Sequence, residues 1–580
     1  MPALVDTEFD FAKWTAELES GVTWRQAEAA ERIAGAFSTD DTDYKVTVCD
    51  AFWRPIGEVG DYIEVSGTIP GNKAPQATLK LKGNHWLDPY LEQCENTMVG
   101  VIIETDGVSE AFYVKRHRRK LENGVWTLTS ELVGIYDILN YLPIWPAWYL
   151  PIQTQPFSHA VYFAPLCTGI EAAASAQAFR IQSGLNEFLN NAASLNPDMR
   201  AWLGTVMQNI KNDIRLTDVL KTPLYVVRTG LLKDSSSIFA KTVRMTTVGQ
   251  MITEVTQGYG IDVRVSLWRP GDPQPDKWAN LDQPTYVMTV KDRSQIEGPT
   301  KTVLDSALRL VVDAQGSLLG KTLDPLLNPE GKYAPEGLYI APALGVNFVP
   351  PYAVLVTPDD IVVDGEVVRD KSPLVTCEIV HSTPLGWQHV IGGKSPKFIN
   401  DFINASLSFL VDAATIILGF TGFPSNLLDG FLSDSLLAFQ MVQHYSRRDD
   451  VGPYHPAIEV FTATNSSPYS VEALFQFIQV LWNSRGYTTA VATFRGQNGP
   501  YKLGRDIFPG ALMTLVYRSR TRLFTDHIDL VSFKATRTER ELTVQMGDGK
   551  PLEHPIVQIK RLWSESVAAL NVVTLAPQSG

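Results

Sequence analysis

The chain has 580 residues, of which 44% are hydrophobic and 19% charged, and its formal net charge is −13. This length exceeds what one hydrophobic core supports, roughly 250–300 residues, so we expect about three or four compact units. The acidic balance argues against a protein that grips nucleic acid with a basic face, although it is compatible with a surface along which DNA slides. No CxxC pair occurs, so we expect free, mostly buried thiols at Cys49, Cys94, Cys167 and Cys377.

The first part of the chain changes from a helical to a strand pattern. The N-terminus, MPALVDTEFDFAKW, is acidic and lacks the apolar segment of a secretory signal. A helical pattern runs from Trp14 to Ala36, and an acidic turn follows it. Apolar and polar residues alternate in 44–49 and 77–82, which predicts half-buried antiparallel strands. Asn123-Gly124 suits a tight hairpin, and we predict a β-barrel or sandwich over 44–142.

The middle of the chain alternates between helical and strand patterns. A proline-rich segment, LPIWPAWYLP, ends the first unit. Its aromatic cluster, Trp145, Trp148 and Tyr149, either stacks on sugars or wedges the connector against a barrel; we favour the wedge. The elements expected next are helices at 170–192 and 197–213, strands and helices over 222–313 with a loop at 268–275, and strands over 336–392 with a hairpin at Asp364-Gly365.

Residues 402–423 form the most apolar stretch of the chain, and a second helix is expected through Leu436 and Met441. The stretch is long enough to cross a bilayer core of about 30 Å, but Asp412 lies in its middle, where a charge costs about 2.5–3.5 kcal/mol. We therefore favour a helical hairpin buried within the protein or between subunits, with membrane insertion as the alternative. The candidate axial plug and interface residues are Phe402, Leu407, Phe409, Leu410, Ile416, Ile417, Leu418 and Phe420.

No sequence motif indicates catalysis, a cofactor or a metal. GxSxG, HExxH, Walker A and EF-hand patterns are absent. The sequence GGKS at 392–395 resembles the end of a P-loop, but Gln388 stands where its first glycine is needed and Pro396 follows, so a strand-to-helix turn is favoured. The nine histidines are scattered without metal-ligand spacing. We therefore predict no catalytic, cofactor-binding or metal-binding residue.

The basic run KRHRRK at 115–120 lies on a predicted strand that enters the hairpin. Such a run contacts phosphate or an acidic partner in some proteins. A solvated strand face is the more ordinary explanation, and we favour it here.

Six sequence blocks carry a family resemblance, and they occur in order over most of the chain. The first is 99–146, where a hairpin with charged strands leads to an exit pattern at Gly134, Leu139 and Pro143 or Pro146. The others are AASAQAFR at 173–180, WRPGDPQP at 268–275, DRSQIEGPTKTVLDSALRLVVD at 292–313, HVIGGKSPKFINDFINA at 389–405 and VQMGDGKPLEHP at 544–555. Together they resemble the tail-tip (baseplate) hub proteins of long-tailed phages, especially minor tail proteins of actinobacterial phages.

The resemblance implies an α+β, multi-domain and β-rich fold with two antiparallel β-barrel domains, α/β insertions and the apolar helical hairpin. The implied divisions are an N-terminal helical arm at 1–43, a first hub β-barrel at 44–146, a helical connector at 147–221, an α/β hub domain at 222–335, a second hub β-barrel at 336–396 and 488–566, an apolar helical insertion at 397–487, and a C-terminal tail at 567–580.

The resemblance also implies a function. The chain would be a structural, non-enzymatic component of the virion tail tip, a homotrimeric ring that closes the tail tube. It would contact the distal tail protein, the tape-measure protein and other minor tail proteins, and open so that DNA passes through without specific binding. Transient contact with the host envelope stays open.

Some hub proteins carry a C-terminal peptidoglycan-cleaving domain, and the short sequence after the last predicted strands leads us to expect none here. Two alternatives remain. One is a receptor-binding or cell-wall-glycan-binding minor tail protein, suggested by the aromatic content. The other is an unrecognised hydrolase that uses a pair of carboxyl groups.

Overall fold

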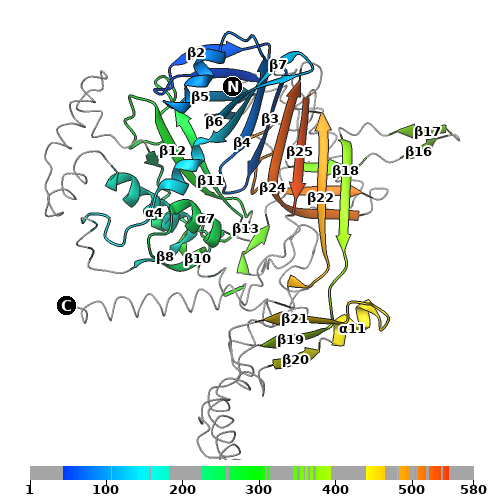
Figure 1. Ribbon diagram of the computed structural model, residues 1–580. Helices are drawn as coiled ribbons and strands as arrows, with labels where there is room; N and C mark the ends of the chain where they lie inside the picture. The colour runs from blue at the N-terminus through cyan, green and yellow to red at the C-terminus, as the bar shows by residue number, and fades with distance from the viewer. Residues whose placement is uncertain are drawn as a thin grey trace, which may run out of the picture. The chain divides into compact units, whose positions relative to one another are not determined.

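The computed structural model describes residues 44–547 with gaps (Figure 1). The residues left out between these limits are 106–107, 151, 153–154, 156–158, 182–223, 257–259, 295, 307, 309–310, 313–343, 349–352, 358–359, 364–365, 370–373, 393–438, 444, 464–479, 481–482, 496–502, 505–506, 518–521 and 537–539. The chain divides into two compact units. The described part of the first falls within 44–379 and 490–547, and that of the second within 380–489.

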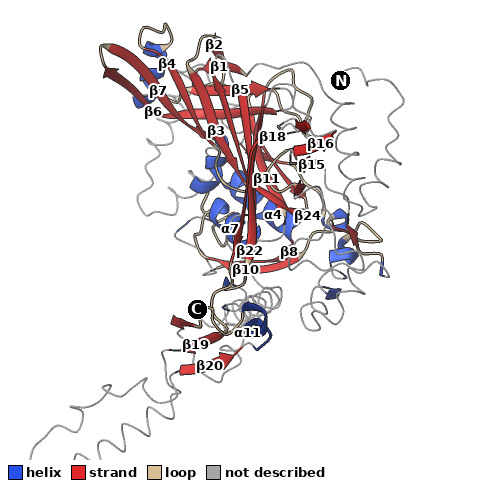
Figure 2. Ribbon diagram, turned by 90° about the vertical axis from the view of Figure 1, so that its right-hand side faces the viewer, coloured by secondary structure: helices blue, strands red, loops and turns tan. Residues whose placement is uncertain are grey.

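Thirteen strands form one sheet, which curls along its length (Figure 2). Its order is β18-β22-β25-β24-β3-β4-β7-β6-β5-β1-β2, while β23 pairs with β24 and β15. The strands are β1 (Lys45–Cys49), β2 (Pro55–Val59), β3 (Glu64–Pro70), β4 (Gln76–Lys82), β5 (Gly100–Thr105), β6 (Val108–Glu122), β7 (Val125–Gly134), β15 (Ala353–Val356), β18 (Leu374–Ser382), β22 (Tyr487–Arg495), β23 (Leu512–Tyr517), β24 (Arg522–Thr536) and β25 (Arg540–Met546). The predicted β-rich class is confirmed. Strands expected in two separate barrels are continuous in this sheet.

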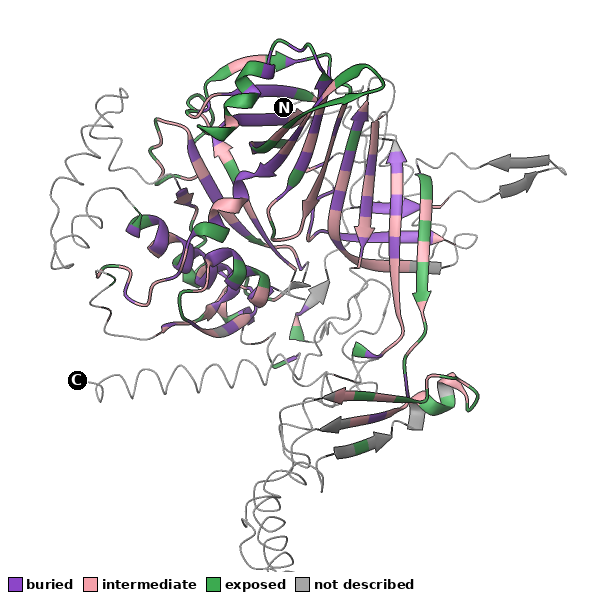
Figure 3. Ribbon diagram, viewed as in Figure 1, coloured by how far each residue is buried: buried purple, intermediate pink, exposed green. Residues whose placement is uncertain are grey.

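The pairing of β3 with β24 joins strands from the two ends of the described chain. Glu64–Pro70 pairs antiparallel with Leu530–Thr536 in an unbroken register. One hydrophobic cluster includes residues of both sets of strands, among them the fully buried Leu79 of β4 and Phe494 of β22. Figure 3 shows buried positions along the strands of both sets. The two halves of the sheet therefore share a core. Unfolding of one half would expose the apolar side chains of the other half to water.

The antiparallel strand predicted at 44–49 is present as β1, but the prediction that it is only half-buried is wrong. Thr47 and Cys49 are 7% and 1% exposed, although Val46 and Val48 beside them are also buried. Strand β1 lies between β2 and β5 with a core on each face: its valines belong to the first hydrophobic cluster and Cys49 to a second. By contrast, β4 alternates between buried and solvent-facing residues as predicted, because only one of its faces is covered.

The hairpin between β6 and β7 forms at the dipeptide that predicted it. Asn123 and Gly124 have φ values of 48° and 77°, the left-handed backbone that a tight two-residue turn requires. The second predicted hairpin is also present, since β16 (Asp360–Val363) pairs with β17 (Glu366–Arg369).

A smaller α/β region supplies the second hydrophobic cluster. Its elements are η2 (Ile135–Tyr141), β8 (Ala160–Pro165), α4 (Leu166–Arg180), β9 (Leu224–Val226), η4 (Leu231–Lys233), β10 (Ile238–Val243), α7 (Val248–Thr256), β11 (Ile261–Trp268) and β12 (Thr285–Asp292). The N-terminus of α4 has no side-chain cap of its own. Asp234 Oδ2 accepts from the Thr168 amide at 2.7 Å, and Ser236 Oγ accepts from the Cys167 amide at 3.1 Å, so residues far along the chain cap this helix.

The aromatic cluster after the first unit packs against α4 and not against a barrel. The Arg180 guanidinium lies 4.2 Å from the centroid of the Trp145 ring. Trp148 makes edge contacts with Phe179 at 5.4 Å and with Tyr149 at 5.6 Å. The cluster therefore packs the connector as predicted, but its partner is the helix α4, so the predicted packing against a barrel is wrong.

The second unit contains a three-stranded sheet in the order β20 (Phe439–Gln443), β19 (Gln388–Gly392) and β21 (Glu459–Ala463), together with α11 (Tyr445–Val451). Met441 lies in β20, so the helix predicted through it is wrong at that point. The GGKS sequence begins at the end of β19, and its remaining residues lie outside the described chain, as do 402–423 and all eight candidate plug residues. Within the described ranges, no helix is long and apolar enough to cross a membrane.

The remaining short elements are α3 (Asp88–Leu91), η1 (Glu92–Glu95), β13 (Ile296–Glu297) and β14 (Asn347–Phe348). All four cysteines are free thiols, as predicted; Cys49 and Cys167 are buried, and Cys94 and Cys377 are partly buried.

Candidate functional site

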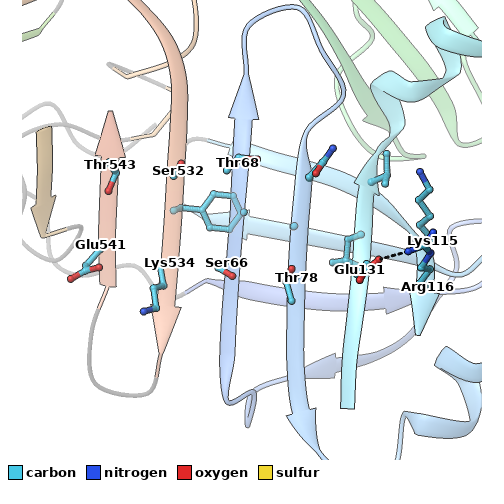
Figure 4. Close-up of a pocket in the computed structure, with 16 residues that line it drawn as sticks. Ser66, Thr68, Thr78, Lys115, Arg116, Glu131, Ser532, Lys534, Glu541 and Thr543 are labelled. Atoms are coloured by element: carbon cyan, nitrogen blue, oxygen red, sulfur yellow. Dashed lines mark ion pairs between the residues drawn. The ribbon is translucent and has the colours of Figure 1, made fainter. Parts of the chain in front are cut away.

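Two rows of residues cross the solvent-facing side of the large sheet, and each uses strands from both ends of the chain. The first row contains, as successive register partners on β25, β24, β3, β4, β7 and β6, Glu541, Lys534, Ser66, Thr78, Glu131 and Arg116. The second row contains, in the same order, Thr543, Ser532, Thr68, Gln76, Val133 and Tyr113. Figure 4 shows labelled members of both rows on neighbouring strands.

A row of core residues lies between these two rows. It contains Leu542, Phe533, Gly67, Ala77, Leu132 and Val114, and every residue in it except the half-buried Gly67 is buried. The side-chain period of a strand is two, so a continuous apolar row on one face requires the rows on either side of it to share the opposite face. The antiparallel register thus aligns the polar residues of six strands.

The two rows border an open hollow of about 700 Å³ on this face (Figure 4). Most of the side chains around it carry hydroxyl, amide or charged groups, and they come from β3, β4, β6, β7, β24 and β25. We call this surface the polar trough.

The charges along the trough alternate in sign. Glu541 is the register partner of Lys534, and Arg116 Nη1 lies 3.8 Å from Glu131 Oε2. At the edge of the trough, Lys80 Nζ is 2.9 Å from Glu64 Oε2, and this hydrogen bond holds the pKa of Glu64 below its usual range. Because each carboxylate has a cation beside it, the trough is strongly polar but close to neutral.

The basic run at 115–120 lies on β6, beyond the last residue that pairs with β5. Strand β5 pairs only with Val108–Tyr113, so the following part of β6 pairs with β7 alone within the described chain. Arg118 pairs with Glu131, and Arg119 Nη1 lies 3.2 Å from Asp88 Oδ2. Charged side chains along an open strand edge also discourage unwanted strand addition. The solvated-face interpretation of the run is therefore supported.

Ser130, His117 and Asp88 form an array that resembles a hydrolase triad. The Ser130 Oγ lies 2.9 Å from His117 Nδ1, and His117 Nε2 lies 2.9 Å from Asp88 Oδ1. In serine hydrolases the nucleophile contacts Nε2 and the carboxylate contacts Nδ1, which is the reverse of this arrangement. Ser130 is also only 1% exposed, so a substrate carbonyl cannot approach its oxygen. The array links α3 to the β6–β7 hairpin as a buried polar network.

Sequence reasoning did not identify the trough. Its individual strands show the alternation of a half-exposed sheet, for example QATLKLK in β4. Nothing in the sequence shows that residues near 66 and near 534 are register partners. Among the described residues, no three His, Cys, Asp or Glu side chains are placed to hold a metal ion.

A family model described as Siphovirus ReqiPepy6 Gp37-like protein matches residues 45–548. No curated protein matches the sequence. The family match defines a structural protein of the siphovirus tail, located in the tail of the virion. More particularly, the chain belongs to the Siphovirus ReqiPepy6 Gp37-like protein family.

Several solved structures are distantly similar. The tail protein from Neisseria meningitidis MC58 has 9% identity and a TM-score of 0.36, with 88% of this chain and 98% of that chain covered. The 43 kDa tail protein of prophage MuSo2 from Shewanella oneidensis has 8% identity and a TM-score of 0.37, with 87% and 98% covered. The prophage tail protein gp18 from Listeria monocytogenes EGD-e has 10% identity and a TM-score of 0.31, with 90% and 99% covered. Similarity this low does not transfer function.

Proposed function

We propose that the chain is the hub at the tip of the tail, a homotrimeric ring that closes the tail tube and opens for DNA at infection. The observation that carries this proposal is the polar trough. Its rows combine strands from both ends of the chain on one face of a curled sheet. Three such sheets around an axis, with the troughs facing inward, would form the wall of a channel.

The chemistry of the trough suits a channel that DNA must leave freely. A surface that binds duplex DNA tightly concentrates Lys and Arg and releases counterions from the phosphates. Here Arg116 stands beside Glu131, and Lys534 is opposite Glu541. The hydroxyls of Ser66, Thr78 and similar residues hydrate the wall without adding charge. The expected result is weak and sequence-independent contact with DNA.

The two halves of the sheet correspond, in this proposal, to two hub barrels that meet at the β3–β24 seam. The distal tail protein and the tape-measure protein would contact the ring, together with other minor tail proteins, and the role would be non-enzymatic. The apolar hairpin predicted around 402–423 would pack with its two copies near the three-fold axis. A polar trough does not provide the dry surface that such a hairpin needs, so its partners would be the other hairpins.

Adding positive charge to the trough tests the proposal. In phage that carry Ser66→Arg with Thr78→Arg, we expect tails of normal length and appearance but DNA release at least about tenfold slower, because added cations attract phosphate. The matched control is Asn96→Arg with Asn280→Arg, two exposed positions away from the trough. DNA release as fast as in the control would exclude the trough as the channel wall.

The number of copies tests the ring itself. Cryo-electron microscopy of the tail tip is expected to show three copies of the chain around the tube axis. Any other copy number, or placement of the chain outside the tube wall, would reject the hub proposal.

A second candidate is glycan binding, and one exposed aromatic group favours it. The Trp86 side chain is 56% exposed although its ring lies against Gly57, and Tyr90, 40% exposed, contacts it edge-on at 6.3 Å. The His85 ring also stacks with Trp86, with centroids 6.2 Å apart, and the exposed part of the indole can stack on a sugar. Quenching of tryptophan fluorescence by host cell-wall glycan in the wild type, absent in Trp86→Ala, would support this role; no quenching at high micromolar glycan would remove it.

A further inference from the structure

The β6–β7 hairpin carries more cations than carboxylates. We call this basic surface the basic strip and define it as Lys115, Arg116, Arg118, Arg119 and Lys120. In the β6–β7 register Arg116, Arg118 and Lys120 share the face of Glu131, and Arg119 shares the opposite face with Leu121 and Trp126, so the strip includes both faces of the hairpin. The side chains of Arg116, Arg118 and Lys120 are 64%, 59% and 66% exposed. The strip follows the part of β6 that pairs with β5, so one edge of the strand is open along it within the described chain.

The charges of the strip exceed those of its neighbours. Glu131 is shared by Arg116 and Arg118. Asp88 lies beside both His117 and Arg119, and Glu122 contacts Lys120. Five cations therefore have three carboxylates around them in the described structure, and a positive excess remains at the surface.

The tip of the same hairpin is apolar. Leu121 is 52% exposed, Val125 63% and Trp126 44%, and Leu121 is the register partner of Trp126. The Arg119 guanidinium lies 5.1 Å from the centroid of the Trp126 ring, which joins the strip to the tip. A partner for this surface should carry negative charge and apolar side chains together.

The chain itself contains a segment with that composition. Residues 1–43, which lie outside the described structure, contain ten Asp and Glu against three Lys and Arg, more than half of the net charge of −13. Their sequence also predicts a helix from Trp14 to Ala36. Trp14 and Leu18 are spaced to share one face of such a helix, and Phe11 precedes it.

The length of this segment allows it to reach the strip on its own copy. Residue 44 precedes β1, whose Lys45 is the register partner of Glu104, which in turn is opposite Ser109 of β6. From Ser109 to the strip is roughly 20–35 Å at about 3.3 Å per residue. A helix of the predicted length spans about 35 Å, and the remaining residues add an extended connection.

We propose that the acidic N-terminal segment, residues 1–43, docks on the basic strip and the apolar tip of the β6–β7 hairpin of the same copy. The carboxylates compensate the excess positive charge, and the apolar residues of the segment cover Leu121, Val125 and Trp126. This proposal does not depend on the trimer. Lys115 and Arg116 also line the polar trough, so the docked segment would cover the β6 edge of the trough.

Zero-length carbodiimide crosslinking of the full chain tests the docking. We expect amide crosslinks from Lys115 or Lys120 to carboxyl groups within 1–43, with a yield that falls severalfold at 0.5 M salt because the attraction is screened. A mixture of isotopically light and heavy protein distinguishes crosslinks within one copy from crosslinks between two copies. Crosslinks confined to like-labelled pairs support docking within one copy; mixed pairs, or crosslinks that never involve 1–43, overturn it.

A matched pair of charge reversals gives an independent readout. In Arg118→Glu with Lys120→Glu, we expect protease cleavage within 1–43 to become at least about fivefold faster than in the wild type. The control is Lys233→Glu with Lys277→Glu, two exposed lysines away from the hairpin, which should leave the cleavage rate unchanged. Equal rates in both variants would overturn the proposal. Both variants must have the circular dichroism spectrum of the wild type, which shows that they are folded. The crosslinking experiment uses the wild type and does not depend on the folding of a variant.

Discussion

The Phe533 ring on β24 lies over Gly67 on β3, so closely that a Cβ atom on residue 67 would be 2.6 Å from the ring Cζ. The same Cβ would be 2.9 Å from the backbone oxygen of Gln76. The Tyr44 ring stacks on Phe533 with centroids 5.4 Å apart. This contact fixes the seam between the two halves of the sheet, since the ring cannot retreat from Gly67 without disturbing Tyr44 and the core.

We predict that Gly67→Ala destabilises the protein by about 1–3 kcal/mol, because the added methyl group overpacks the seam against both a ring and a backbone atom. The control is Gly60→Ala, where the added Cβ meets nothing within 4 Å and the effect should stay within about 0.5 kcal/mol. Thermal or urea unfolding of the two variants measures the difference. Equal midpoints for both would contradict the role given to the seam.

The capping of α4 gives a second prediction. Asp234 is 2% exposed and accepts four hydrogen bonds, two from Thr168 and two from Ser236. Asp234→Ala should lower the free energy of unfolding by about 2–4 kcal/mol, because it leaves buried donors without an acceptor at a helix N-terminus. Asp234→Asn keeps one acceptor oxygen and should lose roughly half as much. Chemical denaturation monitored by circular dichroism would show the order, and equal losses in the two variants would refute the capping account.

Glu110 predicts a pH dependence of stability. Burial is the main cause that raises the pKa of this β6 carboxyl to about 7, Arg264 opposes the rise and Asp262 adds to it. Because the folded state holds the proton more tightly than the unfolded state, the stability that this group contributes is present at low pH. It is lost as pH rises from about 4.5 through about 7.

The variant Glu110→Gln should remove this loss. We expect it to be more stable than the wild type at pH 8, by about 1–2 kcal/mol, and nearly equal to it at pH 5. Melting curves at the two pH values provide the comparison. A constant difference between variant and wild type across this range would show that the Glu110 carboxyl titrates in its ordinary range.

The apolar stretch predicted as an axial plug leads to a fourth prediction. Charge substitution at Leu407, Ile416 or Ile417 should impair tail assembly or leave tails that leak, because a charge placed among packed apolar side chains must be desolvated. The yield of infectious particles and the integrity of tail tips in electron micrographs measure this. Normal particles that carry all three substitutions would refute the plug.

The sequence allowed the fold to be predicted in part. Predictions were correct where the structure depends on a short stretch of sequence. Asn123-Gly124 predicted the hairpin, and QATLKLK predicted a strand with one buried face. They failed at β1, since residues distant in sequence cover the face of Thr47 and Cys49 that the alternation marked as exposed. They failed again at Met441, where apolar residues form the strand β20 and not a helix. The polar trough could not be predicted from the sequence, because it depends on the register between β3 and β24.

That register also determines when the protein can fold during its synthesis. Strand β24 is synthesised long after its partner β3. The edge of β3 that pairs with β24 therefore stays unpaired during most of translation. Contacts between such distant segments form slowly and leave partly folded chains prone to aggregation. A chain released early, with the C-terminal strands missing, would display an unpaired sheet edge. We expect such a truncated copy to be bound by chaperones or cleaved by proteases before it can assemble.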